Sequence, residues 1–243
     1  MNLQNQTALV TGGGSGIGLG IAAALAAEGC RVAIAGRGAE RLKAAVAGCP
    51  CQPPLRWQTC DVADRAQVER LFAWFAAEIG PLDILVNSAG INVRNRRMAD
   101  LDPADWDRMM AVNANGTYYC MRAALPEMRR RQSGLIVNVC SVAGRRALRL
   151  AGPAYCASKF AVAALGTAAS SEERPNGVRI TTIFPGEVNT PILAQRPEPV
   201  PSERLAQMLQ PEDLGALVVA LAKLPPRVVV PEVVVTPLYQ EFV

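Results

Sequence analysis

The 243-residue sequence contains no histidine, and charged residues make up only 19% and aromatic residues only 5% of it. Ser-His-Asp hydrolases, Cys-His proteases and zinc enzymes with histidine ligands are therefore excluded, because each needs an imidazole. A group that exchanges protons with a substrate must be a tyrosine, a lysine, a cysteine or a carboxylate. The net charge of +4 is modest, and no basic block with interleaved aromatic residues predicts nucleic-acid binding.

The seven cysteines do not indicate a disulfide framework, because their number is odd and most lie in apolar stretches. Reduced, buried thiols of this kind are typical of cytoplasmic proteins. Cys49 and Cys51 flank a proline as a metal clip could, but no further ligands accompany them, so we predict no metal site. No apolar run reaches about 18 residues, and no basic-then-apolar leader opens the chain, so neither membrane insertion nor secretion is predicted.

Apolar, strand-like runs alternate with amphipathic, helix-like stretches, and no internal repeat or low-complexity linker interrupts them. Strands that are apolar on both faces and separated by helices indicate a parallel sheet covered on each side. We therefore predict one α/β domain over residues 1–243, a Rossmann-type doubly wound sheet of about seven strands with helices on both faces. The expected strands are 6–11, 31–36, 55–60, 84–87, 135–140, 179–184 and 228–235, and the expected helices are 17–28, 39–47, 66–79, 103–128, 154–173 and 211–224.

Residues 187–210 break this alternation with four prolines between the sixth expected strand and the last expected helix. Loops of this length inside a compact domain are usually functional or disordered. Because this one follows the carboxyl end of a strand, where such sheets bind ligands, we expect it to be a lid over the substrate.

A glycine-rich turn follows the first expected strand and reads Thr-Gly-Gly-Gly-Ser-Gly-Ile-Gly over residues 11–18. Glycines allow a tight turn and a close approach of the backbone to a pyrophosphate, whose charge the amides of the next helix stabilise. The spacing Gly-x3-Gly-x-Gly differs from the usual G-x-G-x-x-G fingerprint, and the Lys-Ser/Thr pair of phosphate-loop NTPases is missing. We predict a dinucleotide site that includes Gly12, Gly14, Ser15, Gly16, Ile17 and Gly18.

The end of the second expected strand indicates which dinucleotide binds. NAD-selective sites place a carboxylate there to hold the ribose 2′-hydroxyl, yet residues 33–38 contain no acid. Arg37 stands where it could bind a 2′-phosphate, which a guanidinium matches with two hydrogen bonds. This favours NADP(H) over NAD(H); the alternative, that Arg37 is a solvated turn residue, stays open here.

Tyr155 and Lys159 stand four residues apart at the start of an expected helix, so they share one face. A neighbouring ammonium favours the phenolate, which makes a tyrosine a usable acid and base near neutral pH. Such pairs are common on helix surfaces, but here Ser141 follows the preceding strand, and its hydroxyl could hydrogen-bond the same substrate oxygen. We interpret the three residues as a candidate catalytic group.

With these residues the sequence resembles the short-chain dehydrogenase/reductase family, in its compact single-domain branch. The similarity extends from Thr11 to about Thr190. Five motifs follow the family's order: Thr-Gly-x3-Gly-x-Gly at 11–18, Asn-x-Ala-Gly at 87–90, the serine at 141, Tyr-x3-Lys at 155–159 and Pro-Gly at 185–186. The resemblance implies an NAD(P)-dependent oxidoreductase that interconverts a secondary alcohol and a ketone. The cofactor supplies the hydride in such an enzyme, which needs neither histidine nor metal.

The resemblance also implies roles for single residues. Tyr155 would be the general acid in carbonyl reduction, Lys159 would hold the nicotinamide ribose, and Ser141 would orient the substrate oxygen. Asn113 would carry a water-linked proton relay to Lys159. The other implied cofactor contacts are with the adenine (Asp61, Val62), the floor of the site (Asn87, Ala89, Gly90) and the nicotinamide side (Pro185, Gly186, Val188, Thr190).

Substrate choice is expected to depend on residues 91–98, 142–152 and the lid. Arginines are frequent there, and a guanidinium in the pocket would suit a carboxylate or a phosphate. The alternative, that most of them make surface or subunit contacts, stays open for Arg94, Arg96, Arg97, Arg145, Arg146, Arg149 and Arg196. Glu187 is a further candidate to face the substrate. The chain's end lacks the Asp-Gly-Gly of many acyl-carrier ketoreductases and is more similar to the branch that acts on 3-hydroxy acids and related small alcohols.

Other functions fit the sequence less well. A catalytically idle, redox-sensing regulator would usually have lost one residue of the Ser-Tyr-Lys group, and this sequence keeps all three. Epimerases and dehydratases of the larger related branch carry an additional C-terminal region, and enoyl reductases space their tyrosine and lysine more widely. Members of the family usually form dimers or tetramers through two long helices, here 103–128 and 154–173, so we expect a homo-oligomer.

Overall fold

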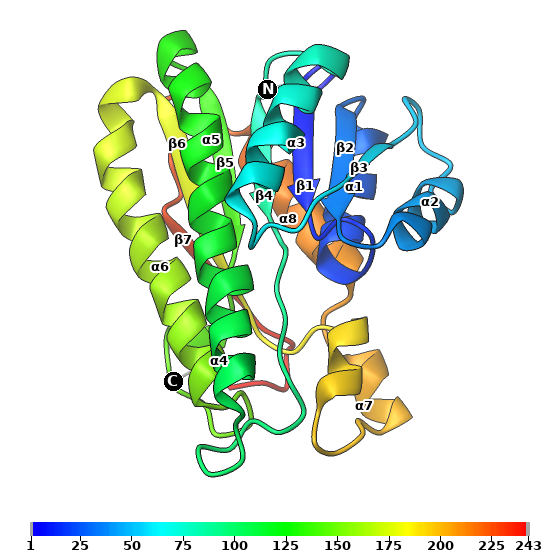
Figure 1. The fold of residues 1–243 in the computed structure, drawn as a ribbon. Coiled ribbons are helices and arrows are strands. Elements are labelled where there is room, and N and C mark those ends of the chain that lie inside the picture. Colours follow the sequence, from blue (N-terminus) through cyan, green and yellow to red (C-terminus); the bar gives the residue numbers. More distant parts are fainter. Residues whose placement is uncertain (1, 242–243) are drawn as a thin grey trace.

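The computed structural model describes residues 2–241 and contains a parallel sheet of seven strands (Figure 1). The strands are β1 (Thr7–Thr11), β2 (Arg31–Gly36), β3 (Arg56–Thr59), β4 (Ile84–Asn87), β5 (Gly134–Val139), β6 (Val178–Pro185) and β7 (Glu232–Val235). Their order across the sheet is β3-β2-β1-β4-β5-β6-β7. The connections change direction between β1 and β4, and sheets of this type bind ligands at the carboxyl ends of the strands beside that switch point.

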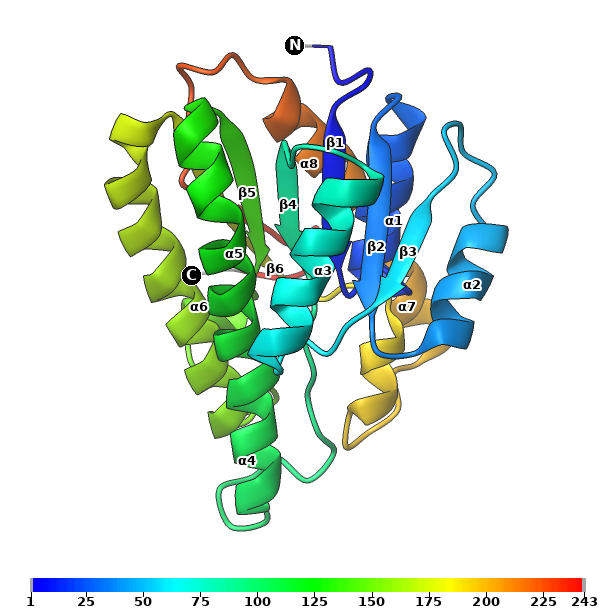
Figure 2. The same ribbon diagram turned by 45° about the horizontal axis from the view of Figure 1, so that its top comes forward.

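Helices cover both faces of the sheet, so the predicted α/β fold class is confirmed (Figure 2). One face carries α1 (Gly16–Ala27), α2 (Ala39–Ala47) and α8 (Pro211–Lys223), and the other carries α3 (Arg65–Glu78), α5 (Gly116–Arg131) and α6 (Pro153–Glu173). Along β1, Val10 packs into the first of these two cores and Leu9 into the second, because successive strand residues point to opposite faces. Strands buried on both faces account for the continuous apolar runs in the sequence.

The seventh strand is shorter than the predicted 228–235. It begins at Glu232, directly after Pro231, and residues 228–231 are not in the sheet. Proline has no N–H to donate to a neighbouring strand, so regular pairing starts after it. The carbonyl of Pro231 still accepts a hydrogen bond from Thr182 N–H (2.9 Å), which connects this approach to β6.

The predicted helix 103–128 is continuous but irregular. It consists of α4 (Pro103–Met109), a π-helical segment η1 (Met110–Asn115) and α5. Short π-helical segments inside α-helices occur frequently at functional sites. Here the segment lies where the helix passes the carboxyl ends of the strands, and α4 extends beyond them (Figure 1).

Segment 187–210 also extends beyond the carboxyl ends of the strands and is more ordered than a loop. It contains the 3-10 helix η4 (Pro191–Gln195) and the helix α7 (Ser202–Gln207), and an isolated parallel bridge joins Val188 to Leu209 at its base. Two further 3-10 helices, η2 (Val142–Gly144) and η3 (Arg174–Asn176), precede α6 and β6.

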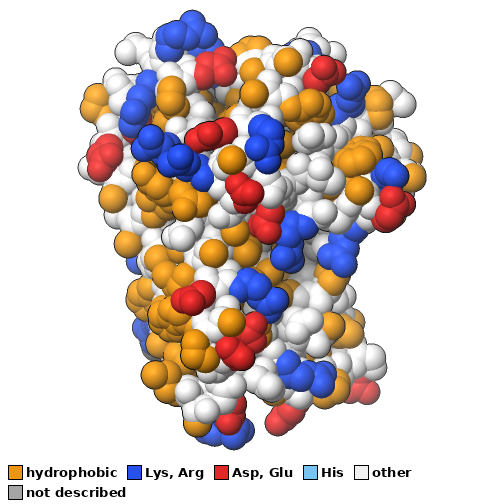
Figure 3. All heavy atoms as spheres, viewed as in Figure 1, with side chains coloured by type: hydrophobic (Ala, Val, Ile, Leu, Met, Phe, Trp, Pro, Cys, Tyr) orange, Lys and Arg blue, Asp and Glu red, His pale blue; other side chains and the backbone are white. Residues whose placement is uncertain are grey.

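The surface is mixed in character. On the face shown in Figure 3, hydrophobic, basic and acidic side chains alternate, and hydrophobic side chains gather on the side formed by α5 and α6. Tyr118 on α5 is 44% exposed and Phe160 on α6 is 43% exposed. Within residues 2–241, no helix combines the length and the apolar character that crossing a membrane requires.

Candidate active site

The glycine-rich turn lies between β1 and α1 and touches the end of β4. Gly12 has φ of +67°, and a Cβ there would lie 2.8 Å from the backbone nitrogen of Ala89. Only glycine allows this conformation and this approach together. Thr11 Oγ1 accepts hydrogen bonds from the N–H groups of Ser88 and Ala89 at 3.2 and 3.3 Å. The turn and the Asn-x-Ala-Gly segment, which the sequence predicts as two parts of a cofactor site, are therefore fixed to each other.

The start of α1 presents unpaired backbone donors. Ser15 is the N-cap residue and makes no capping hydrogen bond with its side chain, and the first turn contains no acidic residue. The N–H groups of Gly16, Ile17 and Gly18 belong to this first turn, where amides have no acceptor within the helix. A Cβ on Gly18 would lie 2.5 Å from the carbonyl oxygen of Gly12, so the turn is packed tightly. Free amides at the positive end of a helix suit a pyrophosphate.

Two arginines lie on the β2 side of the turn. Arg37 follows β2 and is exposed, a position compatible both with a 2′-phosphate contact and with a solvated turn residue. Arg41 on α2 is also exposed, and its Cγ lies 3.4 Å from the position that a Cβ on Gly14 would take. Arg41 was not among the residues predicted from the sequence; it stands in the first turn of α2, four residues after Arg37. The acid between them, Glu40, pairs with Lys43 at 2.8 Å.

Asn87, the last residue of β4, has an unused hydrogen-bond acceptor. Its Nδ2 donates to Oδ1 of Asn138 on β5 at 2.9 Å, whereas its own Oδ1 is buried and has no partner among residues 2–241. Buried polar atoms in proteins are normally hydrogen-bonded. This oxygen therefore fits a donor on a bound group, such as a hydroxyl or an amide of a dinucleotide.

Asp61 and Val62 follow β3 at the same edge of the sheet. Asp61 Oδ1 accepts a hydrogen bond from Ala63 N–H (3.0 Å), which holds the turn. Val62 is buried and packs against Gly116, where a Cβ would come within 2.6 Å of Val62 Cγ2. The structure thus places both predicted adenine contacts at the carboxyl ends of the strands, where the glycine-rich turn also lies.

The candidate catalytic residues come from the end of β5 and the start of α6. Lys159 is buried, its Nζ donates to the carbonyl of Val139 (3.0 Å), and it lies 5.7 Å from the centroid of the Tyr155 ring. Ser141 caps η2 and accepts a hydrogen bond from Ala143 N–H at 3.1 Å. The turn η2 packs against α6 because Gly144 is a glycine: a Cβ there would lie 2.7 Å from the carbonyl oxygen of Lys159. This packing brings the η2 turn, with Ser141 at its start, against the part of α6 that carries Lys159.

Asn113 occupies the π-helical segment and is fully buried. Its Oδ1 accepts from Ile91 N–H (2.8 Å), and its Nδ2 donates to Ile91 O (3.0 Å) and to Ser158 Oγ (2.9 Å). A Cβ on Gly90 would lie 3.5 Å from both Asn113 Oδ1 and Lys159 Nζ. Asn113 and Lys159 therefore flank Gly90, and the amide of Asn113 ties the floor of the site to α6.

The predicted nicotinamide-side residues follow β6 and return toward the glycine-rich turn. Pro185 ends β6, and Gly186 lies in van der Waals contact with the side chain of Gln240. Val188 is buried, and a Cβ on Gly16 would lie 3.1 Å from Thr190 Cγ2. The loop after β6 thus lies against the glycine-rich turn at the start of α1.

Glu187 does not present a free carboxylate to this cleft. It accepts hydrogen bonds from Arg196 (2.8 Å), Arg204 (2.8 Å) and the hydroxyl of Tyr239 (2.5 Å). Burial alone would raise the pKa of Glu187, but the hydrogen bonds from Tyr239, Arg204 and Arg196 lower it below its usual value. The carboxylate is therefore paired with Arg196 and Arg204 of segment 187–210 and with Tyr239. It is not free to face a substrate as the sequence suggested.

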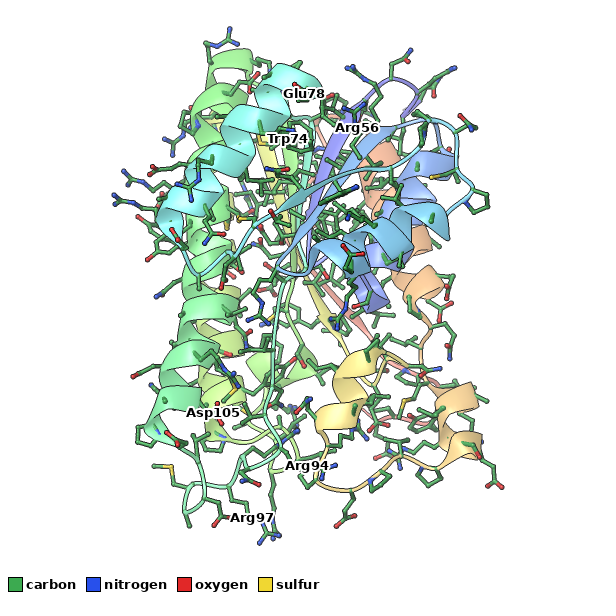
Figure 4. All side chains as sticks on the ribbon, turned by 45° about the vertical axis from the view of Figure 1, so that its right-hand side comes forward. Arg56, Trp74, Glu78, Arg94, Arg97 and Asp105 are labelled. Atoms are coloured by element: carbon green, nitrogen blue, oxygen red, sulfur yellow. The ribbon has the colours of Figure 1, made fainter. Side chains whose placement is uncertain are left out.

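The seven arginines expected near the substrate do not all lie together. Arg145 stacks over the ring of Phe184 (4.5 Å) and pairs with Glu232, so it lies on the β6–β7 side of the sheet. Arg94 and Arg97 lie on the segment between β4 and α4, beyond the sheet, as Figure 4 shows. Arg96, between them in sequence, is only 7% exposed.

Residues 2–241 contain no group of three or more His, Cys, Asp or Glu side chains that could hold a metal ion. The cysteines at 30, 49, 51, 60, 120, 140 and 156 are free thiols.

Comparisons with known proteins agree with this arrangement. Residues 6–200 match the family model described as short chain dehydrogenase. The chain is 36% identical to an uncharacterized oxidoreductase of Staphylococcus aureus (strain MW2), over 97% of this chain and 98% of the relative. It is 34% identical to D-beta-hydroxybutyrate dehydrogenase of Cupriavidus necator, over 90% of this chain and 92% of the relative. The solved closed form of serine dehydrogenase complexed with NADP+ superimposes with a TM-score of 0.89 at 30% identity, over 98% of this chain and 97% of the other.

Proposed function

The chain belongs to the short-chain dehydrogenase/reductase family and is an NAD(P)-dependent oxidoreductase; from this premise we propose that it uses NADP(H) to interconvert a secondary alcohol and a ketone, with a small 3-hydroxy acid and its 3-oxo acid as the substrate pair. The observation that carries this proposal is the proximity of the Lys159 ammonium to the Tyr155 ring (5.7 Å), with Ser141 at the start of the η2 turn that packs against the same helix. Two relatives whose names denote action on hydroxy acids support the substrate class.

The residues present fit a dinucleotide. The free amides of α1 suit its pyrophosphate, and the unpaired Oδ1 of Asn87 suits a hydroxyl or amide donor. We assign the cofactor contacts to Gly12, Gly14, Ser15, Gly16, Ile17, Gly18, Arg37, Asp61, Val62, Asn87, Ala89, Gly90, Tyr155, Lys159, Pro185, Gly186, Val188 and Thr190. When bound, the nicotinamide supplies or accepts the hydride.

The protein's own residues handle the proton. In ketone reduction the hydroxyl of Tyr155 donates its proton to the substrate oxygen, and in alcohol oxidation the phenolate takes it back. The ammonium of Lys159, whose Nζ lies 5.7 Å from the centroid of the Tyr155 ring, stabilises that phenolate, and the Ser141 hydroxyl orients the substrate oxygen with a hydrogen bond. Asn113 positions Lys159 across Gly90 and provides the start of a water-linked proton path.

The cofactor preference rests on two exposed guanidinium groups, because Arg37 and Arg41 both lie beside the turn. A charge-assisted hydrogen bond contributes about 1.5–3 kcal/mol, so losing one should weaken NADPH binding about 10- to 100-fold.

Titration of the protein with NADPH and NADH, followed by nicotinamide fluorescence, tests this preference. We expect wild type to bind NADPH more tightly, and R37Q to lose affinity for NADPH while its affinity for NADH stays within about twofold. R41Q tests the second arginine in the same way, and R227Q in the exposed turn between α8 and β7 is the control for the charge change. Equal losses for both cofactors would refute the 2′-phosphate role.

Turnover is tested by NADPH oxidation in the presence of small 3-oxo acids and neutral ketones. Consumption of NADPH that depends on the carbonyl compound supports the enzyme. Tight cofactor binding without turnover of any carbonyl or alcohol would instead favour the catalytically idle, redox-sensing regulator.

We further propose that segment 187–210 closes over the substrate and that the protein is a homo-oligomer in the cytoplasm. The exposed Tyr118 and Phe160 on α5 and α6 support pairing through these helices, and free thiols are typical of reducing compartments. Light scattering after size-exclusion chromatography should give a multiple of the 25.8 kDa chain mass. A monomer at micromolar concentration would contradict the oligomer.

A further inference from the structure

A cavity of about 380 Å³ lies between the segment after β4 and the start of α6. Its lining includes Arg96, Arg97 and Arg149, and no acidic side chain contributes to it. Gly152 and Pro153 at the start of α6 form another part of the wall. Figure 4 shows Arg97 at the outer end of this region. The cavity is therefore strongly basic.

Arg96 is the buried member of this basic group and has no counter-charge. Its guanidinium donates to the backbone carbonyls of Leu150 (3.2 Å) and Gln195, while its Nε has no hydrogen-bond partner. No carboxylate among residues 2–241 lies within ion-pair distance of it. Buried charges in proteins are normally paired, because an unpaired one loses its hydration without compensation. Burial and the nearby Arg196 both lower the pKa of Arg96, which is the effect of a positive charge in need of an anion.

The start of α6 adds positive potential to the same cavity. The N-cap residue, Gly152, has no side chain, and Pro153 follows it, so the N–H groups of Ala154 and Tyr155 have no acceptor within the helix and no side-chain cap. Gly152 has φ of +83°, and a Cβ there would lie 2.8 Å from Cβ of Arg96. Glycine thus lets Arg96 lie against the positive end of a 21-residue helix. An anion bound in the cavity would be stabilised both by the guanidinium of Arg96 and by the positive end of this helix.

The position of Arg96 relates the cavity to the reaction. Arg96 lies against Gly152, three residues before Tyr155, the proposed proton donor, and its hydrogen bond to Gln195 reaches segment 187–210. Resting on the proposed function, we infer that this cavity binds the carboxylate of the substrate and that Arg96 is the specificity-determining residue that recognises it. An oxo acid bound there would be held at one end by Arg96 and at its carbonyl by Tyr155 and Ser141.

The inference is tested by binding without turnover. Enzyme saturated with NADPH cannot transfer a hydride to 3-hydroxybutyrate, because both partners are reduced, so isothermal titration measures the affinity of a stable ternary complex. The methyl ester of 3-hydroxybutyrate has the same carbon skeleton without the charge. We expect wild type to bind the acid at least about 10-fold more tightly than the ester, from one charge-assisted contact.

Variants then assign the effect to Arg96. R96Q should weaken binding of the acid about 10- to 100-fold and leave the affinity for the ester within about twofold of wild type. R96K keeps the positive charge but lacks the planar guanidinium, so its affinity for the acid should lie between those of R96Q and wild type. R227Q, with the same loss of charge in the exposed turn between α8 and β7, should match wild type in its affinity for both ligands. If R96Q does not fold, the comparison of acid and ester on wild type and R96K still decides.

Equal affinity of wild type for acid and ester would overturn the inference, as would an R96Q variant that weakens both ligands alike. In either case NADPH binding and reduction of ketones would leave the proposed function intact. Failure of NADPH to bind, or of any carbonyl to be reduced, would instead refute the proposed function and this inference with it.

Discussion

Replacing Gly12 by alanine tests whether the glycine-rich turn must touch β4. The new Cβ would lie 2.8 Å from backbone atoms of Ala89, which no side-chain rotation can relieve, at a φ of +67°. The left-handed conformation costs a non-glycine residue about 1–2 kcal/mol, and forcing extra volume into a packed site costs about 1–3 kcal/mol. Together these predict that G12A lowers the free energy of unfolding by about 2–5 kcal/mol.

The matched control is Gly14, two residues further along the same turn. A Cβ there would lie 3.4 Å from flexible side-chain atoms of Arg41 and Leu42, so G14A should unfold within about 1 kcal/mol of wild type. Urea unfolding followed by far-UV circular dichroism, at one protein concentration, measures both variants. If G12A is no less stable than G14A, the close approach of the turn to Ala89 is not a structural requirement.

Two further predictions concern Tyr155 and Glu173. Y155F should lower kcat about 100- to 10,000-fold while the dissociation constant for NADPH stays within about twofold of wild type; retained turnover would remove Tyr155 from the mechanism. Glu173 is 1% exposed, and its pKa is lowered mainly by the hydrogen bond from Arg129, against the effect of burial and with help from Asn176. Its ion pair therefore stabilises the protein above the unfolded pKa of about 4.3, and that stability is lost as pH falls through the lower folded value. E173Q should lower the free energy of unfolding at pH 7 by about 1–2 kcal/mol and flatten its acid dependence; an unchanged urea midpoint would contradict this.

Much of the fold could be predicted from local sequence patterns. Strands buried on both faces are apolar along their whole length, so β1, β4 and β5 were found close to their true bounds. The error at β7 came from reading the valines before Pro231 as strand, although pairing starts only after that proline. Periodicity also could not distinguish a regular helix from one with the π-helical segment at 110–115, because one extra residue in a turn barely alters an apolar pattern.

The candidate site was predictable where a motif lies within one element, as for Tyr155 and Lys159 on α6. Features that depend on contacts between distant segments were not. The unpaired oxygen of Asn87 depends on Asn138, which belongs to another strand, and the burial of Arg96 depends on Gly152 and on segment 187–210. A single sequence carries no direct record of such pairings, whereas spacing within a helix is fixed by its geometry.

The carboxylate of Glu187 connects two parts of the chain that the sequence keeps about fifty residues apart, since it binds both Arg204 and Tyr239. An affinity tag fused to the carboxyl terminus would therefore pull on the same contacts that hold segment 187–210, whereas the amino terminus enters β1 at the opposite end of the sheet (Figure 1). Over evolutionary time, residues 187, 196, 204 and 239 should also be substituted together, because a change at one of them alone would leave a charged group or a hydroxyl without its partner. Segment 187–210 and the segment that carries Tyr239 are, in this sense, expected to be conserved or replaced as one unit.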